Sequence, residues 1–127
     1  MAGIGSELHE HIIDLVRSDV VELLRSNGFE EILIGGDETI FSILSGQLWT
    51  KGKRKYPDLF LLHAGNGVCI EVGNYNPSKW FEFPVVHIGF NGIVTPIRCE
   101  GNDFAGAVYV TTVDVISKHR GNNFNIT

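Results

Sequence analysis

The sequence predicts an α/β domain in which a long N-terminal helix packs against a sheet built around one hairpin. From Ser6 to Asn27, apolar residues recur at three- and four-residue steps, which is the pattern of an amphipathic helix. Further along, two apolar runs at 57–63 and 68–73 flank the turn signal Gly65-Asn66-Gly67, as in an antiparallel hairpin. A chain of 127 residues fits a single domain covering residues 1–127.

Composition excludes several classes of protein. Hydrophobic residues make up 43% of the chain and charged residues 20%, which is typical of a folded globular protein rather than a disordered one. No run approaches the roughly 18 apolar residues of a membrane span, and the N-terminus lacks the order of a signal peptide. We therefore expect a cytoplasmic protein with no membrane partner. Cys69 and Cys99 are too far apart for a Cys-x-x-Cys motif and are expected to be buried free thiols.

The N-terminal helix has recognisable start and stop signals. Ser6 is the expected N-cap, Asn27-Gly28 supplies a left-handed ending, and Ser18-Asp19 is a point where the helix could divide in two. The apolar stripe comprises Leu8, Ile12, Ile13, Leu15, Val16, Val20, Val21, Leu23 and Leu24.

The remaining elements are predicted mainly as strands. Residues 37–49 fit helical spacing loosely, but Gly46 and the β-branched content favour a strand or irregular structure. Residues 114–120 are expected to form one or two helical turns before a loose tail. The expected strands cover residues 29–36, 59–63, 68–72, 84–90, 93–99 and 107–113.

Two acidic residues in the central hairpin are unusual. Asp58 stands at the head of one apolar strand and Glu71 inside the next. With the turn at 65–67, Asp58 lies opposite Gly73 or Asn74, and Glu71 lies two or three residues further into the hairpin. Burying both carboxylates costs free energy unless a cation compensates them. That cation is either a lysine or arginine side chain or a divalent metal, and Mg²⁺ or Mn²⁺ suits one or two carboxylates together with water and phosphate oxygens.

The same residues carry a family resemblance. Pro57-Asp58, followed by Glu71-Val72-Gly73 at the end of an apolar strand, is similar to the PD-(D/E)xK motif of the restriction-endonuclease-like nucleases. The resemblance covers roughly residues 6–90. It implies a restriction-endonuclease-like core, with a central mixed β-sheet that contains an antiparallel hairpin and has a long N-terminal helix packed on it. It also implies a Mg²⁺-dependent nuclease.

By this resemblance, Asp58 and Glu71 are catalytic residues and metal ligands. The carbonyl of Val72 is a further ligand, and a helix carboxylate completes the set, for which Glu10 is preferred over Glu7 and Asp14. The family's lysine is replaced by Gly73, which removes an electrostatic contribution of several kcal/mol to catalysis. Lys79 is the expected substitute, a cation of residues 51–55 is another, and loss of activity is the third alternative.

A basic segment precedes the hairpin. It contains four of the ten lysines and arginines of a chain whose net charge is −5: Lys51, Lys53, Arg54 and Lys55. Such a cluster is either a solvated loop or a contact for a phosphate backbone, so nucleic acid is the expected partner, DNA rather than RNA. His9 and His11 point to different helix faces and are expected at the surface, whereas His87 lies in an apolar strand as a hydrogen-bonded core histidine. Trp49, Tyr75 and Trp80 flank the hairpin and either stack on bases or belong to the core.

Three functions remain open on the sequence. The first is a metal-dependent nuclease acting on phosphodiester bonds. The second is a nuclease-like fold without catalysis that binds nucleic acid or protein through the basic segment. The third is a structural domain that forms oligomers, a homodimer being one form, in which the acidic pair makes salt bridges to Lys79 or Arg54.

Overall fold

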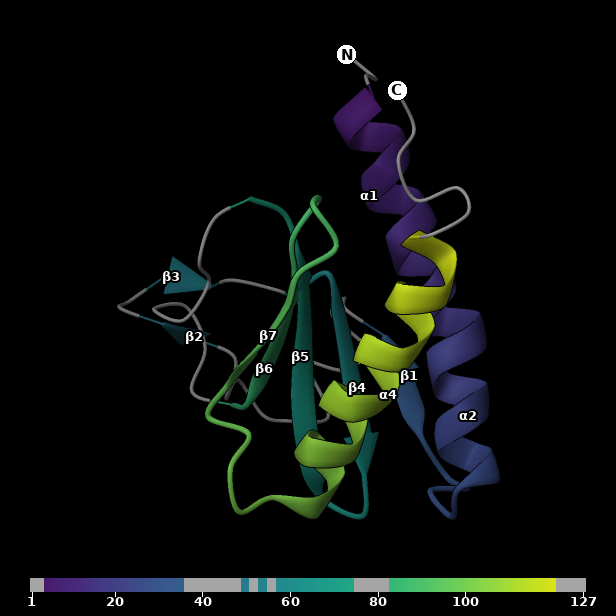
Figure 1. The fold of residues 1–127 in the computed structure, drawn as a ribbon. Coiled ribbons are helices and arrows are strands. Elements are labelled where there is room, and N and C mark those ends of the chain that lie inside the picture. The colour runs from purple at the N-terminus through teal and green to yellow at the C-terminus, as the bar shows by residue number, and fades with distance from the viewer. Residues whose placement is uncertain (1–3, 36–48, 51–52, 55–56, 75–82, 121–127) are drawn as a thin grey trace.

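The computed structural model describes residues 4–35, 49–50, 53–54, 57–74 and 83–120, which form a mixed α/β fold (Figure 1). The large sheet has five strands in the spatial order β1-β4-β5-β6-β7. All neighbours are antiparallel except β5 and β6, which are parallel and are joined by residues 73–84. The strands are β1 (Leu33–Gly35), β4 (Leu59–His63), β5 (Asn66–Val72), β6 (Val85–Ile88) and β7 (Val94–Ile97). A separate two-stranded sheet pairs β2 (Trp49–Thr50) with β3 (Lys53–Arg54).

The predicted N-terminal helix is confirmed. It runs as α1 (Ile4–Leu15), a π-helical turn η1 (Val16–Val20) and α2 (Val21–Ser26). The helix begins at Ile4, before the Ser6 predicted as its N-cap. At Ser18-Asp19 the helix widens instead of breaking, and the Ser18 hydroxyl donates to the Asp14 carbonyl at 2.8 Å. The chain leaves α2 through Gly28, whose φ of +106° only glycine adopts readily.

The central hairpin is also confirmed, but its predicted register is wrong. Strand β4 pairs with β5 from Leu59–Ile70 to His63–Asn66, so the turn residues are Ala64 and Gly65. Their φ values of 49° and 83° give the left-handed two-residue turn that matches the twist of a hairpin. Sequence reasoning centred the turn on Asn66 because asparagine tolerates positive φ better than alanine does. As a result, Asp58 stands one residue beyond the Leu59–Ile70 pair, on the level of Glu71 rather than of Gly73 or Asn74.

The predicted strand at 107–113 is wrong, because residues 103–120 form one helix, α4 (Asp103–Arg120). The Asn102 side chain caps this helix by accepting from the Ala105 N–H at 2.9 Å. The run of valines and threonines favours a strand locally, but burial follows a helical period. The buried residues are Phe104, Ala105, Val108, Thr112, Val115 and Ile116. The Thr112 hydroxyl is satisfied by the Val108 carbonyl at 2.6 Å.

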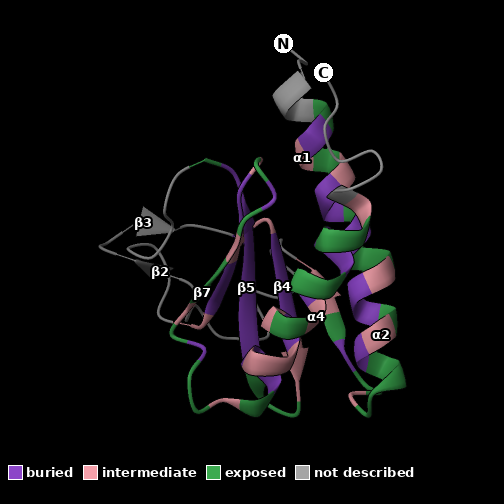
Figure 2. Ribbon diagram, in the orientation of Figure 1, coloured by how far each residue is buried: buried purple, intermediate pink, exposed green. Residues whose placement is uncertain are grey.

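The described helices α1, α2 and α4 pack with η1 on one face of the large sheet (Figure 1). On this face β5 contributes Val68, Ile70 and Val72 to a continuous apolar core. The alternate positions of β5 point to the opposite face, where Cys69 and Glu71 are nevertheless buried. Figure 2 shows β4 and β5 buried along most of their length, whereas the outer surfaces of α2 and α4 are exposed.

Several other expectations are shortened or lie outside the described residues. The predicted strands at 29–36, 84–90 and 93–99 exist but are shorter, as β1, β6 and β7. Cys69 and Cys99 are buried free thiols, as expected. Residues 37–48, Lys51, Lys55 and the segment 75–82 with Lys79 lie outside the described part of the chain. None of the helices that the structure describes has the length and apolar content that crossing a bilayer requires.

Candidate functional site

Asp58 is held by the backbone of β5. Within β5 the N–H groups of Cys69 and Gly73 donate to the β6 side, so the intervening N–H of Val72 faces the β4 side. There it donates to Asp58 Oδ2 at 2.8 Å. The carboxylate thus takes the place of a backbone carbonyl just beyond the last β4–β5 pair. This bond fixes the position of Asp58 at the end of the sheet. Its donor is Val72, the residue whose carbonyl was predicted as a metal ligand.

Helix α1 brings two more polar side chains to Asp58. His9 Nε2 lies 3.2 Å from Asp58 Oδ2, and His9 Nδ1 lies 3.7 Å from Glu10 Oε2. The side chains of His9 and Asp58 are 29% and 26% exposed, so their contact is partly shielded from solvent, whereas Glu10 is 72% exposed. Of the predicted helix carboxylates, Glu10 is therefore linked to Asp58 through His9. Sequence reasoning assigned His9 to the surface and missed this role.

Glu71 is the one carboxylate that the structure buries inside a described strand, with 4% of its surface exposed. It lies between Ile70 and Val72, which point to the helices, so its side chain leaves β5 on the opposite face. In the parallel pairing of β5 with β6, its partner position is His87. Burying a carboxylate is expensive, which marks this position as functionally or structurally constrained.

His87 and Gly73 lie beside Glu71 at the end of β5. His87 Nε2 is 2.9 Å from the Gly73 carbonyl oxygen, so the expected hydrogen bond is found, but His87 is half-buried rather than a core residue. Gly73 itself has a φ of +156°, outside the range that side-chain-bearing residues prefer. A lysine at this position would be strained. The backbone conformation therefore agrees with the absence of a lysine two residues after Glu71.

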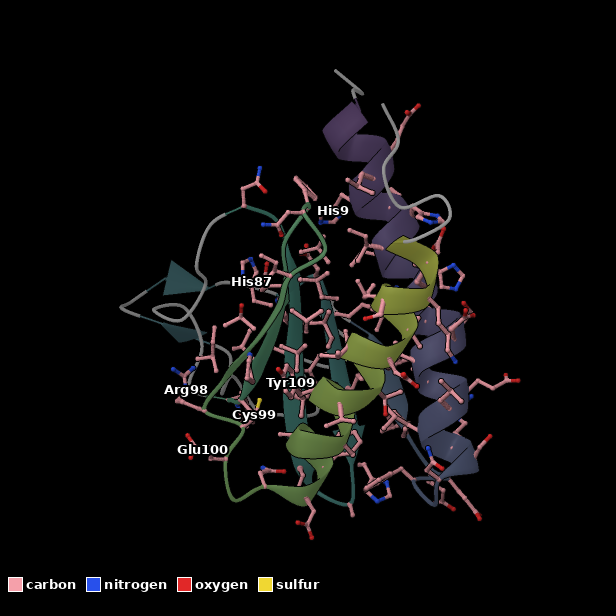
Figure 3. All side chains as sticks on the ribbon, in the orientation of Figure 1. His9, His87, Arg98, Cys99, Glu100 and Tyr109 are labelled. Atoms are coloured by element: carbon pink, nitrogen blue, oxygen red, sulfur yellow. The ribbon has the colours of Figure 1, made fainter. Side chains whose placement is uncertain are left out.

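The polar groups gather at one end of the sheet, and Figure 3 shows His9 and His87 toward that end, above Arg98 and Glu100. The structure brings Asp58, Glu71, Val72 and Glu10 to this end, and we call these four residues with His9 the carboxylate end. The backbone of Lys53–Arg54 belongs to β3, which stands away from the helices in Figure 1. Among the described residues, no three histidine, cysteine, aspartate or glutamate side chains are close enough together to hold a metal ion.

The pKa values of the two buried thiols, Cys69 and Cys99, are shifted by their surroundings in the sheet. Burial raises the pKa of the Cys69 thiol well above its usual value, and the Glu71 carboxylate raises it further. Burial likewise raises the pKa of the Cys99 thiol. Both cysteines are therefore protonated at neutral pH and are poor nucleophiles. This excludes them as catalytic thiolates.

A second histidine–carboxylate pair lies away from the carboxylate end. His119 Nε2 of α4 is 3.0 Å from Asp19 Oδ2 of η1. The pair lines a cavity of about 300 Å³ between the two helices. The distance between its nitrogen and oxygen is close to that of His9 and Asp58, but this pair is also a hydrogen bond. None of the predicted site residues lines that cavity, so mutation of His119 can serve as a control for mutation of His9.

Comparison of the chain with protein-family models, with curated proteins and with solved structures finds no match. The sequence feature that could have indicated His9 is its position next to Glu10, on the helix that also carries the apolar stripe.

Proposed function

We propose that the protein is a metal-dependent nuclease that hydrolyses phosphodiester bonds of nucleic acid, with Asp58 and Glu71 as its central residues. The observation that carries the proposal is their adjacency. Asp58 stands one residue before the Leu59–Ile70 pair and Glu71 one residue after it, so the two acids occupy neighbouring backbone positions. In antiparallel strands such positions are about 5 Å apart at Cα. A cation shared by the two acids would lie at the end of the sheet, because the Asp58 carboxylate contacts His9 of α1 whereas the Glu71 side chain leaves β5 on the face away from the helices.

The order of elements supports the resemblance to restriction-endonuclease-like proteins. A helix is followed by β1, by the Pro57-Asp58 strand β4, by the Glu71 strand β5 and then by a parallel strand β6. A mixed sheet covered by helices and carrying an antiparallel hairpin is the core that the resemblance implies. The hairpin holds both acidic residues at the same end.

The chemistry of the donors fits Mg²⁺ or Mn²⁺. Asp58, Glu71 and the Val72 carbonyl would supply oxygen ligands, whereas Glu10, predicted as a further ligand, is 72% exposed and forms no three-residue ligand group with them among the described residues. Because no group of three acidic, histidine or cysteine side chains forms among the described residues, most of the remaining ligands would be water and substrate oxygens, as is usual for Mg²⁺. When bound, the metal would polarise the phosphodiester and activate water for attack. Lys79 or a cation of residues 51–55 would take the electrostatic role of the family's lysine.

The test uses metal binding and cleavage together. Millimolar Mg²⁺ or Mn²⁺ is expected to raise the thermal unfolding midpoint by several degrees, because a ligand at 100 times its dissociation constant stabilises the native state by about 2.7 kcal/mol. Asp58→Asn and Glu71→Gln should each abolish this shift. Asparagine can still accept from the Val72 N–H, so the hydrogen bond to the backbone is kept. Cleavage of single-stranded, duplex or branched DNA should fall on the order of 100-fold or more in both variants.

Asp114→Asn is the matched control, because Asp114 is an exposed carboxylate on α4 far along the chain from the hairpin. It should leave both the metal-induced shift and cleavage unchanged. A midpoint that does not respond to either metal, with no cleavage of any of the three DNA forms, would rule out the nuclease.

The second candidate is a nuclease-like fold that binds nucleic acid without cleaving it. The positive φ of Gly73 favours it, because that backbone conformation disfavours the lysine that the family uses. In this case the protein binds DNA through the basic segment, and affinity falls steeply with salt. Replacing Lys53 and Arg54 by alanine should then lower the slope of log K against log salt by about 1 for each phosphate that is no longer neutralised. A slope unchanged in the double variant would assign these residues to a solvated loop.

A further inference from the structure

The polar contacts that described residues make to Asp58 fall on only one of its two carboxylate oxygens. Both of its contacts in the structure, from the Val72 N–H at 2.8 Å and from His9 Nε2 at 3.2 Å, fall on Oδ2. No described residue contacts Oδ1 of this carboxylate. One hydrogen bond and one histidine contact on the same oxygen restrain that oxygen, and the second oxygen can then accept a ligand.

We infer that His9 is a positioning residue for Asp58, which together with the Val72 N–H holds Oδ2 so that Oδ1 faces a divalent cation. The inference deepens the proposed function and rests on it. Residues that hydrogen-bond a metal-ligating carboxylate fix its orientation, and their loss typically weakens metal binding 10- to 100-fold.

The two contacts to Oδ2 come from different parts of the fold, which is why His9 is the informative one. The Val72 N–H belongs to the sheet and is present whenever β5 is folded. His9 belongs to α1, so its contact joins the orientation of Asp58 to the packing of the helix on the sheet. Glu10 Oε2 lies 3.7 Å from the other ring nitrogen, beyond hydrogen-bond distance, and its side chain is 72% exposed.

The experiment compares two near-isosteric substitutions of His9. Glutamine keeps an N–H donor at a position similar to Nε2, whereas methionine has a similar length and helix propensity but no donor. Mn²⁺ binding is measured by calorimetry at one fixed pH, together with the Mn²⁺-induced shift of the unfolding midpoint. We expect His9→Met to bind Mn²⁺ 10- to 100-fold more weakly than the unchanged protein, and His9→Gln to stay within a few-fold of it.

His119→Met is the matched control. It breaks the other histidine–carboxylate pair, at 3.0 Å between α4 and η1. It should therefore lower the free energy of unfolding about as much as His9→Met does, without changing the affinity for Mn²⁺. This separates a general loss of stability from a loss of positioning.

Two results overturn the inference while leaving the proposed function intact. If His9→Met lowers stability equally with and without Mn²⁺, His9 only ties the helix to the sheet. If His9→Met binds Mn²⁺ more tightly, His9 competes with the metal for Asp58. If the unchanged protein does not bind Mn²⁺ at all, the proposed function fails, and the inference about His9 fails with it.

Discussion

The two faces of β5 are both buried, but one buries only apolar side chains whereas the other buries a carboxylate. Toward the helices, Val68, Ile70 and Val72 join one apolar core. On the opposite face, Cys69 is fully buried and Glu71 is 4% exposed, so a thiol and a carboxylate share a region from which solvent is largely excluded. The first face needs only shape and hydrophobicity, whereas the second keeps a charged group at a cost in desolvation.

The difference indicates where the molecule carries function. A charged residue could be replaced by an apolar one on the second face if stability were the only requirement, because well-packed apolar residues are often at least as stable as buried charges. The helix face contains no such residue within β5. Function is therefore expected on the second face and at the end of the sheet, where Asp58 is held, rather than in the helix layer.

The face of β5 that carries Glu71 is a packed core only if its large side chains contribute strongly to stability. Phe60 is fully buried there and packs against Phe83, with ring centroids 5.1 Å apart. It also fills the space above Gly67, where an added Cβ would lie 2.2 Å from its ring. Phe60→Ala should lower the free energy of unfolding by about 3–5 kcal/mol, through lost burial and the cavity that remains. Urea unfolding measures this value.

Leu33→Ala provides the control for Phe60. Leu33 lies on the edge strand β1, opposite Leu62 of β4, and is 53% exposed. Its replacement should cost clearly less, because most of a half-exposed side chain remains in water when the protein is folded. Equal losses in the two variants would mean that the second face is no better packed than the edge of the sheet.

The hairpin and the N-terminal helix were predictable because their local and tertiary signals agree. The apolar stripe of α1 to α2 has the helical period, and β4 and β5 are apolar runs joined by a glycine-rich turn. The register was not predictable, because Ala64 takes a φ of 49° that alanine seldom adopts. For α4, β-branched residues favoured a strand locally, and the Asn102 cap and the burial of the helix against the sheet decided otherwise.

The two acidic residues of the candidate site could be predicted from the sequence, but the contact between His9 and Asp58 could not. Asp58 and Glu71 stood out because charges interrupt apolar runs. The contact between His9 and Asp58 joins residues that are far apart in the chain, and a single sequence does not determine which helix residue faces the end of β4. Gly73 was recognised as a departure from the motif, but its positive φ, which explains why lysine is disfavoured, is a property of the folded backbone alone.

Cys69 on the same face contributes a smaller effect, a dependence of the free energy of unfolding on pH. In the unfolded chain this thiol loses its proton near its ordinary pKa of 9.0, whereas in the folded protein burial and then Glu71 raise the pKa well above that value. Below pH 9 both states hold the proton, so the contribution to stability is fully present. Above pH 9 the unfolded state alone ionises, so the free energy of unfolding falls as pH rises, by about 1.4 kcal/mol per pH unit for one thiol.

Urea unfolding between pH 8 and roughly 10.5, the range around the ordinary thiol pKa, measures this slope under reducing conditions. Cys69→Ala should remove one thiol's share of the slope, and Cys99→Ala should remove another, because burial also raises the pKa of that thiol. In Glu71→Gln, the free energy of unfolding should still begin to fall near pH 9, where the unfolded thiol ionises. The decrease should stop at a lower pH, because the carboxylate no longer raises the pKa of Cys69 in the folded protein. A slope that Cys69→Ala does not change would show that this thiol is accessible to water. The face of β5 that carries Glu71 would then be solvated, and the buried carboxylate would lose its significance as a functional marker.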